Sequence, residues 1–288
     1  TVSNANGLGT VPGGAVTVNN GATLSLSAAP ASKPIILAGG STLSAGSTNI
    51  SLTGPVTLTG NATIDTSVTV ILNGVVSGTG SLTKAGSGTL NLYGANTFSG
   101  GITITAGYIN SYSANIDASG NPIAGGLGIG NSVTISGGYL TPWANSLITS
   151  LSGTSGKVDT SNATLTFGGD NSSTTFSGTF GGSLALIKNG TGTFTNGATN
   201  LNTVLFTINN GVMQLNHANA GSNSNFTIGP NGTLDLNGFN GGLATSSIFH
   251  IQGSGYNGQG ALINSSATAS NFKACLLYTS PSPRDQRG

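Results

Sequence analysis

Residue types that commonly perform acid–base catalysis or bind metals are sparse in this chain of 288 residues. The two histidines, His217 and His250, are far apart in the sequence and have no Cys, Glu or nearby Asp to complete a ligand set. Because a zinc site needs three or four converging ligands, we expect both histidines to lie in solvent or in turns. The sequence therefore assigns no catalytic, cofactor-binding or metal-binding residue, and no cofactor.

Aspartate is the only acidic residue type in the chain. Asp65 and Asp235 alternate with Ile or Leu side chains that should point inward, so we expect both carboxylates to face solvent. Glycosidases need two carboxyl groups flanking the bond to be cleaved, and no two aspartates lie within ten residues of each other. Stacking of distant segments could still bring two together, so a polysaccharide-degrading enzyme is kept as an alternative.

Two lysines and two aromatic residues occupy positions that could serve a function, but each position also has a purely structural explanation. Lys84 and Lys188 occupy matching places in two similar segments. Repetition of a structural unit explains this, and we predict that both amines are solvated at an edge. Trp143 and Tyr139 could form a stacking platform for a sugar, or they could belong to a loop that packs on its scaffold, and the second interpretation is favoured.

The framework that must position these side chains is a repeat of about 20 residues. Glycine-led strand starts recur at nearly equal steps, first at Gly21, Gly40, Gly60, Gly80 and Gly101, and after an interruption at Gly192, Gly211 and Gly232. Such a period is typical of a β-solenoid with one coil per repeat, and it predicts roughly 13 coils in a rod about 60 Å long.

Alternation of apolar and polar residues predicts a strand wherever a coil should present one. The clearest runs are at residues 16–18, 23–26, 56–59, 89–92, 102–104, 133–135, 206–208 and 226–228. Glycine and asparagine between the runs are expected to form corners, where both tolerate positive φ. Helical spacing is not sustained in any window, so we predict an all-β chain. The segment from Asn110 to Gly130 is the largest break in the period, and we expect a loop that carries recognition residues or a plain insertion.

Composition and charge narrow the classes of function. Glycine accounts for 48 residues, charged residues for only 5%, and the formal net charge is +1. Nucleic acids and anionic membranes are recognised by clustered Lys and Arg, so we expect no nucleic-acid partner. The longest apolar runs are too short to span a bilayer, and no direct membrane insertion is expected. The chain starts without an initiator Met or a signal-peptide pattern, which indicates an internal piece of a longer gene product.

The C-terminal tail differs in character from the rest of the chain. Residues 275–288 contain the only Cys, both arginines and two closely spaced prolines. The stretch CLLYTSPSPRD resembles the translation of a transposase adapter used in short-read library preparation, so we hypothesise that this tail is a sequencing artefact. Long-read resequencing that finds the same codons would disprove this. Residues 1–274 are then expected to form a single β-helix.

The densest repeat unit lies at residues 78–109 and follows the pattern KxGxGTLxLxGxNTYxGxTxxxxGxL, with Phe98 in place of Tyr and Ile109 near the final Leu. The positions that fit are Lys84, Gly86, Gly88, Thr89, Leu90, Leu92, Gly94, Asn96, Thr97, Gly100, Thr103 and Gly107. A degenerate copy at residues 182–196 repeats the first part of the pattern, with Lys188 in the place of Lys84. This unit resembles the autotransporter-associated β-strand repeat.

The resemblance implies a right-handed parallel β-helix, with the coil of about 20 residues read from the period, displayed on or released from a Gram-negative cell. It also implies an outer-membrane β-barrel translocator in another part of the gene. We therefore expect a surface-displayed or secreted, non-catalytic stalk or adhesive segment, whose partner would be a host or environmental glycan or protein surface. A third alternative is an ice- or crystal-binding solenoid. That function would need an unbroken threonine ladder, whereas outward positions near Thr57, Thr59, Thr164 and Thr166 mix Ser, Asn and Asp with Thr.

Overall fold

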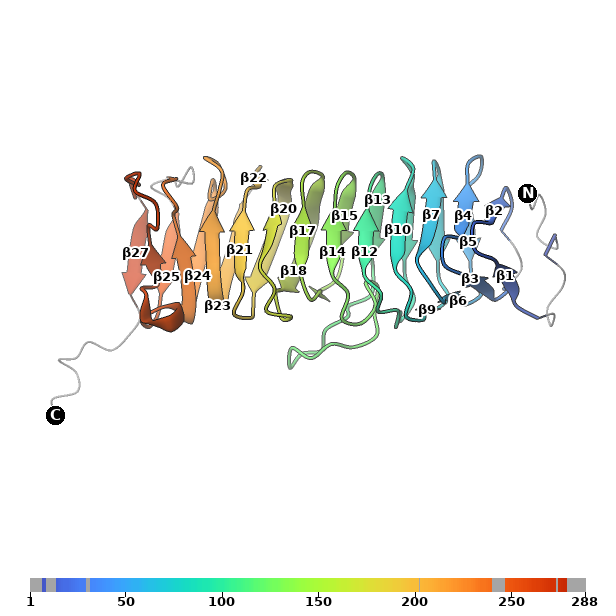
Figure 1. Cartoon of the computed structure of the whole chain (residues 1–288), viewed down its shortest axis with the longest axis horizontal. Coiled ribbons are helices and arrows are strands. Elements are labelled where there is room, and N and C mark those ends of the chain that lie inside the picture. The colour runs from blue at the N-terminus through green and yellow to red at the C-terminus, as the bar shows by residue number, and fades with distance from the viewer. Residues whose placement is uncertain are drawn as a thin grey trace.

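The computed structural model describes residues 7–8, 14–29, 32–201, 203–239, 247–272 and 274–278. The chain winds around one axis as about 11 turns of roughly 20 residues, and Figure 1 shows the strands stacked side by side along a rod. The predicted all-β parallel β-solenoid is confirmed. The expected number of about 13 coils was too high. Two coils are longer than the period, since Ile102 aligns with Val133, and Ile248 aligns with Cys275.

The strands form three faces of the rod, here called faces A, B and C. Face A contains β2 (Thr23–Leu26), β4 (Thr42–Ala45), β7 (Ala62–Thr66), β10 (Leu82–Ala85), β12 (Ile102–Ile104), β14 (Val133–Ile135), β17 (Leu151–Gly153), β19 (Thr174–Phe176), β21 (Thr193–Asn196) and β26 (Leu262–Ile263). Face B contains β5 (Ile50–Leu52), β8 (Thr69–Leu72), β11 (Thr89–Leu92), β13 (Tyr108–Ser111), β15 (Tyr139–Pro142) and β22 (Thr199–Asn200). Face C contains β1 (Val16–Val18), β3 (Ile35–Leu37), β6 (Val56–Leu58), β9 (Val76–Ser77), β16 (Ser146–Leu147), β25 (Ile248–Ile251) and β27 (Cys275–Tyr278).

Four longer strands run around a corner and belong to two faces. They are β18 (Lys157–Phe167) and β20 (Thr179–Lys188), which join faces B and C, and β23 (Val204–Leu215) and β24 (Ser224–Asp235), which join faces C and A. The sequence predicted shorter strands because glycine and asparagine interrupt these segments. The structure keeps the backbone pairing through the corners, with a register shift between Ser161 and Thr164 in β18. A single helical turn, η1 (Tyr256–Gly258), follows β25 among the described residues.

Neighbouring strands on each face pair in parallel with a nearly constant offset. On face A, Ala62 aligns with Leu82, and Leu82 aligns with Ile102, so each step equals the period of the sequence. Successive side chains of a strand point to opposite sides of a sheet. Aligned residues of successive coils therefore form rows of side chains that run along the axis of the rod. Neighbouring rows alternate between the inside and the outside of the rod.

The apolar side chains that were predicted to point inward form one core cluster along the rod. Leu43, Leu92 and Ile104 are fully buried. In the C-terminal half, the core contains a stack of phenylalanine rings, with centroids 5.1 Å apart between Phe206 and Phe226 and 4.7 Å apart between Phe226 and Phe249. Stacked aromatic pairs add to the stabilisation that burial provides. Each coil thus buries its apolar residues only with its neighbours' help.

Two different physical requirements select glycine at the corners. Gly107 has a φ of 65°, a left-handed conformation that glycine adopts without strain. Gly80 instead meets a neighbouring coil, because a Cβ atom added there would lie 2.0 Å from the Gly60 carbonyl oxygen. Positive φ was expected to explain glycine at the corners, whereas close approach of stacked backbones explains it at Gly80.

The predicted break after residue 110 is a real insertion. Tyr108 aligns with Tyr139 across it, an offset well above the period. In Figure 1 the insertion is the green loop that projects below the rod between β13 and β14. Buried amides tie its base down: Asn115 Nδ2 donates to the Leu147 carbonyl at 2.7 Å, and Asn131 Nδ2 donates to the Phe98 carbonyl at 2.9 Å. Its base is therefore part of the solenoid.

The first residues of the suspected tail form a strand in the structure. β27 pairs in parallel with β25, with Cys275 opposite Ile248, and all four of its residues are exposed. The remaining tail residues, 279–288, lie outside the described residues. The hypothesis that the tail is an artefact stays a prediction.

Candidate functional site

The two histidines occupy the surface positions expected for them. His250 is exposed on β25. His217 lies in a turn, where its Nδ1 atom accepts a hydrogen bond from the Asn219 amide at 3.0 Å. Within the described ranges, no three His, Cys, Asp or Glu side chains are grouped to hold a metal ion.

The aspartates are divided between exposed and buried positions. Asp65 is exposed, as predicted. The same prediction is wrong for Asp235, which is 2% exposed. Its carboxylate accepts hydrogen bonds from the Ser265 hydroxyl at 2.6 Å and from Gln214 Nε2 at 2.9 Å, because the segment after β26 lies against it. Burial by itself raises the pKa of Asp235, but these hydrogen bonds outweigh burial and lower the pKa below its usual value.

Three other aspartates also have local partners. Asp117, at the tip of the insertion, accepts hydrogen bonds from the amides of Ser119 and Asn121, both at 2.9 Å. Hydrogen bonds from Asn121 are the main cause that lowers the pKa of Asp117. The carboxylate of Asp170 accepts a hydrogen bond from the Ser172 hydroxyl at 2.7 Å. Asp159 forms an ion pair with Lys157 on face B.

The prediction that Lys84 and Lys188 are solvated edge residues is wrong. Lys84 is fully buried and Lys188 is 3% exposed. Lys84 Nζ donates to the carbonyls of Ala85 and Gly86 at 2.5 and 2.7 Å, and to the Ala106 carbonyl of the next coil at 3.4 Å. The amine thus supplies a donor to three half-buried corner carbonyls, and polar groups that are covered without a partner are costly.

The second lysine repeats this arrangement further along the rod. Lys188 Nζ donates to the carbonyls of Asn189, Gly190 and Asn210 at 2.9, 2.8 and 3.1 Å. Burial lowers the pKa of each lysine to about 8, and the charges of Asp65 and Asp170 oppose this shift at Lys84 and Lys188 respectively. The sequence signal for this structure is the KxGxG pattern itself, since the turn after the lysine supplies two of the acceptors.

The aromatic side chains on the surface are arranged differently from the predicted pair. Trp143 does not stack on Tyr139. It stacks on Tyr112, with centroids 5.9 Å apart and planes 4° apart, and Tyr112 stacks on Tyr93 at 4.3 Å and 3°. Tyr139 stacks on Tyr108 at 4.6 Å and 16°. Burial, followed by the neighbouring phenol of Tyr93, raises the pKa of Tyr112.

These five rings form two rows on face B, which we call the aromatic face. One row follows the ends of β11, β13 and β15 at Tyr93, Tyr112 and Trp143, and the other occupies the first residues of β13 and β15. Between the rows, Asn110 Nδ2 donates to Asn91 Oδ1 at 2.9 Å. Tyr93 and Tyr108 were not predicted as candidate residues, and Tyr112 was expected only as part of the loop after Asn110, whereas it directly follows β13. A signal was available, because YINSY and YLTPW place aromatic residues four positions apart in aligned coils.

Face A carries an unbroken row of hydroxyl groups. Six threonines are aligned coil by coil and Ser152 continues the row, in the order Thr23, Thr42, Thr63, Thr83, Thr103, Thr134 and Ser152. The threonines cited from the sequence do not form such rows, since Thr57 lies between Ile36 and Ser77, and Thr164 aligns with Ala185. A threonine ladder therefore exists on face A, although the outward positions were expected to be too mixed in residue type for one.

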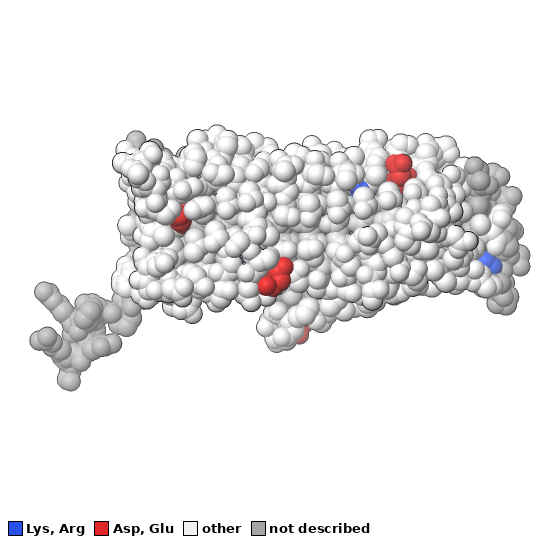
Figure 2. Space-filling view, viewed as in Figure 1, with Lys and Arg blue, Asp and Glu red and all other residues white. Residues whose placement is uncertain are grey.

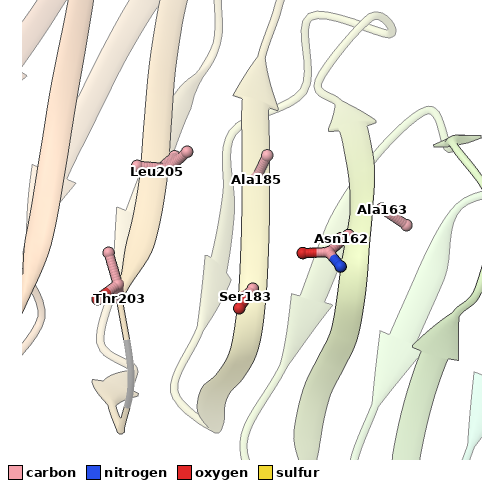
Figure 3. Close-up of a pocket in the computed structure, with 6 residues that line it drawn as sticks. All are labelled: Asn162, Ala163, Ser183, Ala185, Thr203 and Leu205. Atoms are coloured by element: carbon pink, nitrogen blue, oxygen red, sulfur yellow. The ribbon is translucent and has the colours of Figure 1, made fainter.

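A shallow hollow of about 320 Å³ lies on the surface formed by β18, β20 and β23. Its lining residues, shown in Figure 3, are Asn162, Ala163, Ser183, Ala185, Thr203 and Leu205. None of these lining residues is charged. On the face shown in Figure 2, charged side chains are isolated spots on an otherwise uncharged surface. No helix within the described parts of the chain has the length and apolarity needed to cross a membrane.

The comparisons with known proteins identify one segment. The family described as passenger-associated-transport-repeat matches residues 82–110, which span β10 to β13 and include Lys84, Tyr93 and Tyr108. No curated protein and no solved structure matches the chain. The resemblance to autotransporter passenger repeats is therefore confirmed over residues 82–110, and the coils on either side continue the same parallel pairing.

Proposed function

We propose that this chain is a segment of an autotransporter passenger, displayed at the surface of a Gram-negative cell or secreted from it, and that it acts as a non-catalytic stalk. The observation that carries the proposal is the passenger-associated repeat at residues 82–110 inside a longer stack of parallel coils. A stack of this kind is stiff, because each coil is hydrogen-bonded and packed to both of its neighbours. An outer-membrane translocator encoded elsewhere in the gene would be its partner in secretion.

The chemistry of the aspartates supports a non-catalytic role. A glycan-cleaving site needs one carboxyl group free to protonate the leaving group and a second one close to it. Asp235 is bound to Ser265 and Gln214, and Asp159 is paired with Lys157. These carboxylates are engaged in local structure.

Surface display can be tested with an epitope tag placed between Ser119 and Gly120 in the full-length gene. This tip of the insertion is exposed, and a side chain added at Gly120 would meet no atom within 4 Å. We expect antibody to label intact cells, with a periplasmic protein as the unlabelled control. Labelling that requires permeabilised cells would contradict the proposal.

The absence of catalysis has a separate test. Purified chain is incubated with plant and bacterial polysaccharides, and new reducing or unsaturated ends are measured over time. We expect no release above a boiled control. Release that Asp159→Asn abolishes would establish the alternative function of a polysaccharide-degrading enzyme.

The threonine row on face A favours a second candidate function, binding to an ordered crystalline surface such as ice. Its hydroxyl groups repeat at the strand spacing of about 4.8 Å, as a regular lattice requires. A thermal-hysteresis measurement tests this, with Thr83→Tyr to break the row and Thr227→Tyr on face C as the control. Hysteresis that only Thr83→Tyr removes would support the function, and absence of hysteresis in the unmodified chain would exclude ice as the surface.

A further inference from the structure

The aromatic face combines exposed ring surface with side-chain amides and hydroxyls. Trp143 is 50% exposed and Tyr93 is 43% exposed, although both rings stack on Tyr112. The ring faces that are covered are those that stack on a neighbouring ring. The ring surface outside these stacking contacts stays exposed, and the Tyr112 hydroxyl is hydrogen-bonded to the side chains of Tyr93 and Asn110. This exposed ring surface offers apolar contact next to hydrogen-bonding groups.

The two aromatic rows are held at a fixed separation by the strands beneath them. Tyr108 and Tyr112 are four residues apart on one extended segment, about 13 Å. The aligned coils place Tyr139 and Trp143 at the same spacing. The row between them contains Asn91 and Asn110. Along the axis, three coils extend about 10 Å. This is a preformed surface with room for a short oligomer.

The charge of the aromatic face restricts the chemistry of its ligand. None of β11, β13 and β15 contains a charged residue. At one edge, Lys157 aligns with Tyr139, but its charge is paired with that of Asp159. A nucleic acid strand would also stack on aromatic rings, yet it needs a basic groove, which these three strands do not provide. An uncharged ligand is favoured, because no charge would have to be desolvated on either side.

We propose that the aromatic face binds an uncharged saccharide chain. Sugar rings present apolar C–H faces edged by hydroxyl groups, which complement the exposed parts of the aromatic rings in the two rows and the amides of Asn91 and Asn110 between them. The insertion starts directly after Tyr112, and its residues help to line a second hollow. Asn145 also lines this hollow and lies two residues after Trp143, so the hollow is next to the aromatic face. This inference goes beyond the stalk function and does not depend on how the chain reaches the cell surface.

The site contains its own reporter, because Trp143 is the only tryptophan in the chain. We would titrate the full chain with uncharged cello-, malto-, xylo- and manno-oligosaccharides, and with chondroitin sulfate as a charged comparison, while recording tryptophan emission. We expect at least one uncharged series to change the emission saturably. No change with any uncharged series at millimolar concentration, or a change with chondroitin sulfate alone, would overturn the proposal.

Variants locate the binding. Tyr112→Ala should weaken binding by about tenfold, as loss of a central aromatic contact does in other recognition sites. Ile248→Ala is the matched control, because Ile248 is an exposed apolar residue on β25, outside the aromatic face, and it should leave affinity unchanged. Trp143→Ala, followed by calorimetry, keeps the proposal testable if Tyr112→Ala does not fold, since half of Trp143 is already in solvent. Equal affinity in a folded aromatic variant and the control would overturn it.

Discussion

Lys84 and Lys188 show how a single polar side chain can hold a corner of the solenoid. Each amine donates to carbonyls of its own turn and of the next coil. The lysine thus links two coils. Several carbonyl oxygens point toward its ammonium group and stabilise the positive charge.

Replacement of Lys84 by methionine should destabilise the chain by about 1–3 kcal/mol, because three half-buried corner carbonyls lose the hydrogen bonds from the amine. Methionine keeps a long apolar stem, so the effect of packing is small. Urea denaturation measures the loss. Lys157→Met is the control, since that amine is partly exposed and makes a surface ion pair, and it should cost less than about 1 kcal/mol. Equal losses would show that the carbonyl contacts contribute little.

The lowered lysine pKa predicts a pH dependence of stability. In the folded chain both amines titrate near 8, whereas their ordinary value is 10.5. Between these values the unfolded chain binds more protons, so stability should rise as the pH is raised from about 8 toward 9.5. Denaturant midpoints across this interval measure the rise. The double variant Lys84→Met, Lys188→Met should show a smaller slope, and identical slopes would contradict the assignment.

What sequence reasoning missed at this scale has a physical cause. Period-two alternation indicates which side of a strand a residue occupies, and it placed Asp65 correctly. It gives no information on whether a later segment covers that side, as happens at Asp235. For Lys84 the pattern itself placed the side chain inward, between buried Leu82 and a corner, and the expectation that lysines are exposed overrode it.

At the scale of elements, corners decide how closely coils can stack. Gly80 lies where two backbones meet, so a methyl group has no space. Asn96 closes another corner, where its side-chain oxygen accepts a hydrogen bond from the Val76 amide at 2.7 Å. Glycine and asparagine thus perform separate tasks, close approach and amide pairing. Strand positions were predictable from alternation, whereas these contacts between coils depend on the fold.

Gly80→Ala should destabilise the chain by about 3 kcal/mol, because the new Cβ would overlap the backbone of the previous coil. Gly169→Ala is the matched control, since a Cβ atom there would meet nothing within 4 Å, and its effect should stay within about 0.5 kcal/mol. Thermal unfolding of both variants gives the comparison. A tolerated Gly80→Ala would mean that the coils can separate locally without loss.

The insertion has a fixed base and a free tip, which predicts unequal sensitivity to substitution. Asn115 Oδ1 accepts from the Leu147 amide at 2.6 Å, and its Nδ2 donates to two carbonyls. Asn115→Ala should cost about 1–3 kcal/mol by leaving those groups unpaired. Asn121→Ala, at the exposed tip, should cost less than about 0.5 kcal/mol. Similar unfolding midpoints for the two variants would show that the base is not part of the cooperative unit.

At the scale of the whole molecule, stability should vary along the rod. Inner coils have partners on both sides, whereas β1 pairs only with β3, and β27 pairs only with β25, among the described strands. The period of glycines and the alternation of apolar residues predicted this architecture, since both are consequences of repeated stacking. They predicted too many turns, because the number of turns depends on how many residues each corner and insertion takes.

Hydrogen exchange of the purified chain should therefore reveal fast-exchanging ends and a slow centre. Amides of β1 and β27 are expected to exchange first, and those of β11 and β12 last, because local opening is easiest where contacts are fewest. Mass spectrometry of peptides from each coil measures the gradient. Uniform protection from one end to the other would contradict it and would indicate that the end strands are covered, for example by association of chains.

The constant offset between aligned residues also bears on how such a chain can change over generations. Ala62, Leu82 and Ile102 occupy one row in three successive coils. Recombination that duplicates or removes a block of about sixty nucleotides would lengthen or shorten the rod by a single strand width of about 4.8 Å. Every surviving row would keep its alignment. A lineage could thus adjust the reach of this molecule in small, equal increments while the surface that meets its surroundings stays the same.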